Sequence, residues 1–188
     1  MRPSLALWSA LLLAGCTLLP GPPPARILHD LGAAPPARAA LPWPLEVRAT
    51  APAWLDDGGV HYRPAGAATR LAVYRDHYWA APPSALLAQR LRDLLAPPPA
   101  GAPARWLEVE ITAFEQRFAA PAGAEARIAA RALLRERRGG TLLASRDFAL
   151  ALPAGAEVDG GVAALAAAMD ALAGELLDWL AAEAGRRP

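Results

Sequence analysis

The sequence predicts an α+β fold, with a mostly antiparallel sheet and two main helices packed on one face of that sheet. Several segments alternate apolar and polar residues, which is the period of a strand with one buried face. Glycine-containing turns join three of these segments at hairpin spacing. Two further segments, starting near Ser84 and Asp159, repeat apolar residues at helical spacing. Placing both apolar helix faces on one sheet face is the simplest way to bury them.

The first strands are short. Ile27–Leu31 is predicted as a strand, and the proline-containing stretch Gly32–Pro44 as a loop. Leu45–Ala49 alternates apolar and polar residues and is predicted as a half-buried strand.

A hairpin is expected next. Residues Pro52–Gly59 begin as a short helical turn and end as a tight turn, which makes Asp56 and Asp57 turn residues. Val60–Arg63 and Arg70–Tyr78 are predicted to pair as antiparallel strands.

The first helix follows, with Ser84 as its predicted N-cap and the prolines from Pro97 to Pro99 as its end. Its apolar face consists of Leu87, Leu91, Leu94 and Leu95.

Trp106–Phe118, Glu125–Arg137 and Thr141–Leu152 are predicted as three consecutive strands. In the first, Leu107, Val109, Ile111 and Ala113 share one face, and Glu108 and Glu110 lie on the other. These two acids could form a carboxylate pair, but cross-strand pairing with arginines of the next strand is preferred. A helix is the alternative for 125–138, since alanine and arginine favour helices. The Gly139-Gly140 turn and the strand after it favour a strand.

The last helix is predicted from Asp159, its expected N-cap, through Trp179. A continuous apolar stripe faces the sheet, formed by Val162, Leu165, Met169, Leu172, Leu176 and Trp179. No stretch after the N-terminal leader is expected to reach the length of a membrane span.

The N-terminus resembles a bacterial lipoprotein signal. Residues 1–15 carry Arg2, an apolar run and small residues before a cleavage site, as in a signal peptide. Leu13, Ala14 and Gly15 precede Cys16, the only cysteine, and this arrangement resembles a lipobox. The resemblance implies cleavage before Cys16 and lipidation (palmitate and related acyl chains) of that residue. A plain signal peptide with a chance or buried cysteine is the alternative.

The remainder divides into a tether and a domain. Residues 16–26 are proline-rich and form a semi-rigid spacer, and residues 27–188 form one domain. Thr17 stands where aspartate retains lipoproteins at the inner membrane of enterobacteria, which favours the periplasmic face of the outer membrane over the inner membrane.

The charge balance argues against a nucleic-acid partner. The chain has 19 basic and 18 acidic residues, so it lacks the basic excess that such partners require. No catalytic pattern, cofactor motif or metal motif is found, and the protein is therefore predicted not to be an enzyme. His29, His61 and His77 have no partner at metal-ligand spacing in the sequence and are expected at the surface or in the hairpin.

Five aromatic residues are candidates for a binding surface. They are Trp54, Tyr62, Tyr74, Tyr78 and Trp79. Exposed aromatic residues often mark interfaces, and the alternative is a corner of the core.

Short motifs around these residues resemble the ABC-type transport auxiliary lipoproteins. They are Pro52-x-Trp54-Leu55-Asp56, Val60-x-Tyr62-Arg63, Arg70-Leu71-x-x-Tyr74 and Trp79-Ala80-x-Pro82-Pro83 before a Leu-rich helix. The tyrosine that usually opens the first strand of the family is missing at Ile27-Leu28.

The resemblance implies a non-catalytic role beside an ABC transporter. The expected partner is a mammalian-cell-entry (MCE) domain protein of an intermembrane lipid transport system, docked at the outer membrane in support of membrane integrity. The chain is also a possible homo-oligomer. The alternative functions are an outer-membrane biogenesis lipoprotein that plugs or pilots a β-barrel or secretin, and a lipid-anchored hydrolase, which the missing catalytic pattern disfavours.

Overall fold

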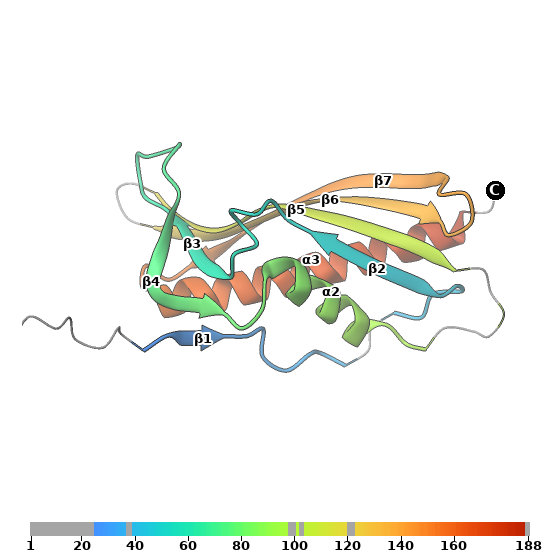
Figure 1. The fold of residues 1–188 in the computed structure, drawn as a ribbon, viewed down its shortest axis with the longest axis horizontal. Coiled ribbons are helices and arrows are strands. Elements are labelled where there is room, and N and C mark those ends of the chain that lie inside the picture. The colour runs from blue at the N-terminus through green and yellow to red at the C-terminus, as the bar shows by residue number, and fades with distance from the viewer. Residues whose placement is uncertain (1–24, 37–38, 98–100, 102–103, 120–122, 187–188) are drawn as a thin grey trace, which may run out of the picture.

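The computed structural model describes residues 25–36, 39–97, 101, 104–119 and 123–186 (Figure 1). Its elements are β1 (Ile27–His29), β2 (Leu45–Thr50), β3 (Gly59–Arg63), β4 (Ala72–Trp79), α2 (Pro83–Leu94), β5 (Arg105–Phe118), β6 (Ala124–Glu136), β7 (Leu142–Ala154) and α3 (Val158–Gly185). The predicted elements all form, with boundaries that shift by a few residues.

The sheet is organised around the long strand β5. On one side β5 pairs antiparallel with β6, which pairs antiparallel with β7. On the other side two short strands lie parallel to different parts of β5, β2 along Arg105–Glu110 and β3 near Gln116. Strand β4 continues the sheet from β3 as an antiparallel hairpin, and β1 lies parallel to β4 at the edge. The predicted hairpins are confirmed, and the parallel pairings were not anticipated.

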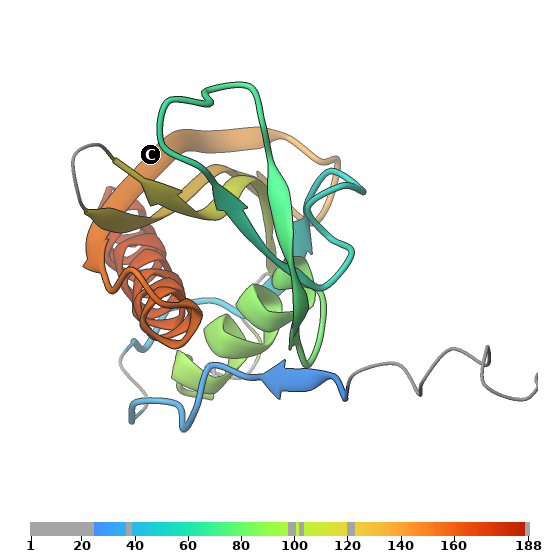
Figure 2. The same cartoon turned by 90° about the vertical axis from the view of Figure 1, so that its left-hand side faces the viewer.

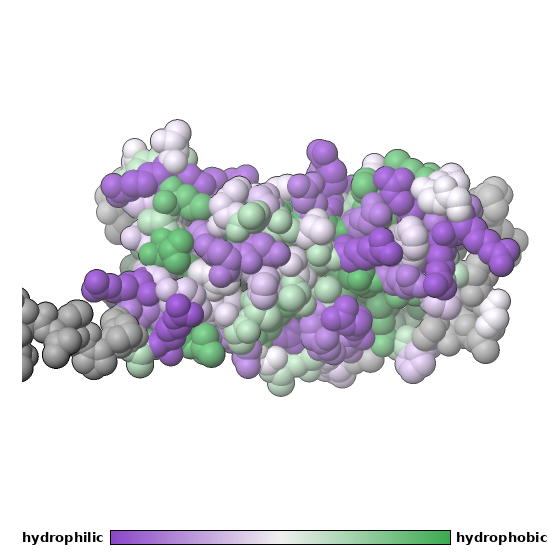
Figure 3. All heavy atoms as spheres, viewed as in Figure 1, coloured by the Kyte–Doolittle hydropathy of each residue, from purple (hydrophilic) through white to green (hydrophobic). Residues whose placement is uncertain are grey.

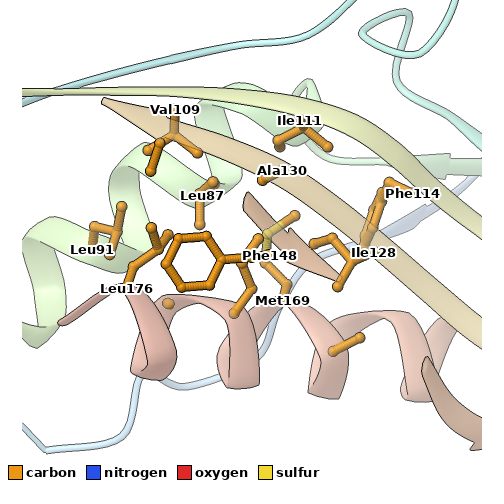
Figure 4. Packing of buried hydrophobic residues seen from close by; sticks show 14 of the residues in the cluster. Leu87, Leu91, Val109, Ile111, Phe114, Ile128, Ala130, Phe148, Met169 and Leu176 are labelled. Atoms are coloured by element: carbon orange, nitrogen blue, oxygen red, sulfur yellow. The ribbon is translucent and has the colours of Figure 1, made fainter. Parts of the chain in front are cut away.

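Both helices pack on the same face of the sheet, as predicted. Figure 2 shows the sheet curling over α2 and α3, which lie side by side beneath it. Figure 4 shows Leu87 and Leu91 of α2 meeting Val109 of β5 and Leu176 of α3. The core includes the fully buried Leu165, Met169 and Leu172 and the whole apolar stripe predicted for the last helix. A fully buried side chain of this size contributes about 1.5–3 kcal/mol, so this interface dominates stability.

Helix α3 has the length and composition of a membrane span, with 28 residues and a mean hydropathy of 1.4 over its most apolar window. The expectation that no later stretch reaches that length is therefore wrong for α3. Its apolar side is buried against the sheet, however, so in this fold α3 is a core helix.

Neither helix starts as predicted. The N-cap of α2 is Pro82, and Ser84 lies inside the first turn. The carboxylate of Asp56 accepts hydrogen bonds from the backbone N–H and the hydroxyl of Ser84, at 3.1 and 2.8 Å. Asp56, which lies in the turn before β3, therefore caps α2. This gives Asp56 a role beyond that of a turn residue. In α3 the N-cap is Glu157, and Asp159 lies in the first turn.

The strand prediction for 125–137 is confirmed, and its helix alternative is not. Within β5 the register with β6 shifts between Ile111 and Ala113, so a bulge interrupts the alternation there. Phe114 is consequently buried, whereas Ala113 is only half-buried. The expected Glu–Arg pairing occurs between Glu108 and Arg135, at 3.0 Å.

Candidate interaction site

The predicted lipid anchor lies outside the described residues. Leu13, Ala14, Gly15 and Cys16 belong to the stretch 1–24, so the lipidation prediction stays a prediction. The described chain enters the domain through Arg26, whose guanidinium lies over the Tyr78 ring at 4.8 Å from its centroid. The tether therefore joins the domain beside the β1–β4 edge.

The structure brings together two of the five predicted aromatic residues. Tyr62 of β3 and Tyr74 of β4 lie with ring centroids 4.5 Å apart, and Phe118 at the end of β5 meets Tyr62 edge-on at 6.1 Å. Tyr62 and Tyr74 are half-buried, so part of each ring faces solvent. We call Tyr62, Tyr74 and Phe118 the tyrosine patch.

A buried amide fixes this patch from beneath. The Tyr74 hydroxyl donates to Oε1 of Gln116 at 2.7 Å, and Nε2 of Gln116 donates to the carbonyl of Gly155 at 2.7 Å. Gln116 is fully buried and lies against Gly161 in the first turn of α3. Burial raises the pKa of Tyr74, so its hydroxyl keeps its proton and remains a donor at neutral pH. The ring of Tyr74 is thereby held in one orientation.

The other three aromatic residues are placed differently. Trp54 is 49% exposed and packs edge-on against His61 at 6.4 Å. Tyr78 is half-buried, and its hydroxyl donates to the carbonyl of Arg75 at 3.2 Å. Trp79 is 3% exposed and packs on Phe114, so for this residue the core alternative holds. The five residues thus do not form one cluster.

An ionic triad borders the tyrosine patch. Glu115 accepts hydrogen bonds from Arg63 at 3.0 and 2.9 Å and from Arg117 at 2.6 Å. Burial acts to raise the pKa of Glu115, but the hydrogen bonds from Arg63 and Arg117 outweigh it and hold that pKa below its ordinary value. The two arginines and Phe118 line an open pocket of about 290 Å³ beside the β3–β4 turn. This end of the molecule therefore combines aromatic rings with two arginines. Figure 3 shows hydrophobic residues exposed among hydrophilic ones over the β3 and β4 end.

His61 and His77 lie in the β3–β4 hairpin, one of the two places predicted for the histidines, but a contact between histidines was not anticipated. Nε2 of His29 and Nδ1 of His77 lie 2.9 Å apart, because the parallel pairing of β1 with β4 brings the two strands together. Burial, and next the proximity of His77, lower the pKa of His29. His61 is 2% exposed and belongs to the interior. His29 and His77 are 48 residues apart, so no sequence motif connects them. Only the pairing of β1 with β4 could have indicated their contact, and the sequence does not show that pairing.

Comparisons with family models and with solved structures relate the chain to known proteins. A family model described as "ABC-type transport auxiliary lipoprotein component" matches residues 29–177. A crystal structure of a protein from Xanthomonas campestris superposes with a TM-score of 0.70 at 21% identity, covering 84% of this chain and 96% of that chain. A crystal structure of an uncharacterised protein superposes with a TM-score of 0.64 at 21% identity, covering 84% and 99%. At these identities the two structures show a shared fold. No curated protein matches the chain.

Proposed function

The chain belongs to the family of ABC-type transport auxiliary lipoproteins, and from this premise we propose that it docks an MCE-domain protein of an ABC lipid transporter at the outer membrane. The observation that carries the proposal is the family match over residues 29–177 downstream of a lipobox-like sequence that ends at Cys16. In this role the domain binds and positions a partner and catalyses no reaction.

The anchor supports a position on a membrane. Two acyl chains hold a protein stably on a bilayer, since each buried methylene contributes about 0.8 kcal/mol. The proline-rich stretch 16–26 would hold the domain away from the lipid surface at about 3.1 Å per residue. Such a standoff leaves the domain free to meet a partner that crosses the periplasm.

The tyrosine patch and the exposed Trp54 support a protein-binding role. Tyrosine, tryptophan and arginine are the residues that most often dominate binding energy at interfaces. Here Tyr62, Tyr74 and Arg63 lie together at one end of the sheet, and hydrogen bonds hold Tyr74 and Arg63 in place. A preorganised surface of this kind loses little entropy when a partner binds.

Affinity purification of the full lipidated chain from detergent-solubilised membranes tests the proposal. The matched bait is the Tyr62→Ala, Trp54→Ala double variant, which should fold, since neither side chain is fully buried. We expect the unaltered chain to recover an MCE-domain protein with its permease and ATPase, and the double variant to recover less. Recovery of a β-barrel or secretin in their place, or of no transporter component, would overturn the proposal.

A further inference from the structure

We infer that His29, His77 and Asp159 form a binding site for a divalent transition metal, with Zn²⁺ as the fitting ion. The three side chains come from β1, β4 and the first turn of α3. One ligand atom from each lies within 4.8 Å of the other two. The site adjoins the tyrosine patch through the contact between His77 and Tyr74, but it shares no residue with that patch or with the predicted anchor.

The spacing of the two histidine nitrogens is close to that of a metal site. Their imidazole nitrogens are 2.9 Å apart. Zinc–nitrogen bonds of about 2.0–2.1 Å in a tetrahedron place two ligand nitrogens roughly 3.3 Å from each other. With ring centroids 5.1 Å apart, the two nitrogens point almost directly at each other. Each imidazole therefore has to turn as well as move slightly apart before both nitrogens face one ion, and the Asp159 carboxylate has to approach by a side-chain rotation.

The donor set selects the class of ion. Two imidazole nitrogens and one carboxylate oxygen suit Zn²⁺ and its transition-metal neighbours, whereas Mg²⁺ and Ca²⁺ prefer oxygen ligands alone. Three protein ligands leave the fourth tetrahedral position for water. Both histidines are half-buried and Asp159 is exposed, so an ion can reach the site from solvent.

The surroundings hold the rings and set the charge. His29 packs edge-on against buried Trp79 at 6.4 Å, and His77 packs against Tyr74 at 6.2 Å. The positive N-terminal end of α3 disfavours a cation, and the negative charge of Asp159 offsets this effect. Without metal, the two imidazoles share one hydrogen bond. Asp159 therefore contributes a negative charge to metal binding that the two histidines lack.

The site would fasten the tether-proximal strand to the domain. Strand β1 has three residues and pairs with β4 alone among the described strands. Its hold on the domain includes the Ala80 N–H donating to the His29 carbonyl at 2.7 Å. A metal ion bound between β1, β4 and α3 would cross-link these three elements. The cross-link would lie at β1, the first strand to bear a force applied to the tether.

Zinc titration of the full chain in detergent, purified without a histidine tag, tests this inference. We expect one Zn²⁺ per chain with micromolar or tighter affinity, a raised Tm, and a Co²⁺ absorption spectrum typical of tetrahedral nitrogen and oxygen ligands. His29→Ala and His77→Ala should each weaken Zn²⁺ binding by at least about tenfold, the lower end of what disturbing a metal site costs. His61→Gln should leave the affinity unchanged, since His61 lies elsewhere in the interior.

Asp159→Asn keeps the test decisive if a histidine variant fails to fold, because Asp159 is exposed. It should weaken Zn²⁺ binding while the circular dichroism spectrum of the apo protein stays unchanged. No saturable Zn²⁺ binding to the unaltered chain would overturn the inference. Undiminished binding to folded Asp159→Asn would overturn it equally, and so would undiminished binding to either histidine variant if that variant folds.

Discussion

Gly161 shows how one residue can fix the junction between α3 and the tyrosine patch. A Cβ at this position would collide with the side-chain amide of Gln116, which is fully buried and bonded at both ends. Gly161→Ala should therefore destabilise the fold by about 1–3 kcal/mol, the usual cost of overpacking. Chemical denaturation monitored by circular dichroism measures this.

Gly185 provides the matched control, since a Cβ there meets nothing within 4 Å. Gly185→Ala lies at the end of the same helix and should leave the free energy of unfolding unchanged or slightly higher. Equal stability of the Gly161→Ala and Gly185→Ala variants would contradict the close packing described for Gln116.

Glu115 links residue chemistry to the pH dependence of stability. Its pKa is lower in the folded chain than the ordinary value of 4.5. Its contribution is therefore complete above pH 4.5 and is lost as the pH falls through the folded pKa. Glu115→Gln should cost about 1.5–3 kcal/mol near pH 7, the range for hydrogen bonds to charged groups.

The stability difference between Glu115→Gln and the unaltered chain should shrink as the pH is lowered from 7 towards 3. Urea unfolding at a series of pH values checks this. Glu175→Gln, on the exposed side of α3, should show a difference near zero throughout. A difference at Glu115 that stays constant with pH would contradict a role for its ionised form.

At the scale of elements, the start of α2 depends on the turn before β3. Asp56→Ala removes the acceptor of both Ser84 hydrogen bonds and should destabilise the protein by about 0.5–2 kcal/mol, the cost of losing a helix cap. Asp93→Ala on the exposed face of α2 is the control and should change stability by less than about 0.5 kcal/mol. Thermal unfolding should give a lower Tm for Asp56→Ala than for Asp93→Ala. Equal Tm values of the two variants would argue against the cap.

Local patterns predict the elements of this fold well and their long-range contacts poorly. The alternation in 125–137 identified β6 because each buried residue on that strand is two positions from the next. Ala113 was predicted to share the buried face of β5. That prediction is wrong because a bulge in β5 interrupts the alternation of buried and exposed residues. The contact of His29 with His77 depends on parallel pairing across 48 residues, which no local pattern encodes.

The same limit applies to the candidate site. Residue type placed Tyr62 and Tyr74 among five candidates without pairing them. The pairing of β3 with β4 brings these two side chains together. Residue type could not separate buried Trp79 from exposed Trp54, since tryptophan is common both in cores and at interfaces. That difference arises from the packing of Trp79 on Phe114 across the sheet.

At the scale of the whole molecule, the proposed lipid anchor would determine where the domain acts. Cys16→Ala removes the proposed thiol acceptor of lipid. We expect metabolic labelling with an alkyne analogue of palmitate to mark the unaltered chain and a Thr17→Ser control, and to leave Cys16→Ala unmarked. Labelling of the Cys16→Ala variant would contradict lipidation at this residue.

Docking to a transporter is tested most directly by site-specific photo-cross-linking in living cells. A photoreactive amino acid replaces Trp54, which is 49% exposed beside the hairpin, or Leu143, which is 39% exposed at the start of β7. The register of β7 with β6, and of β6 with β5, places Leu143 at the far end of the sheet from the tyrosine patch. We expect a cross-link from position 54 to an MCE-domain protein and none from position 143. The absence of that cross-link from position 54, or its appearance from position 143 instead, would contradict it.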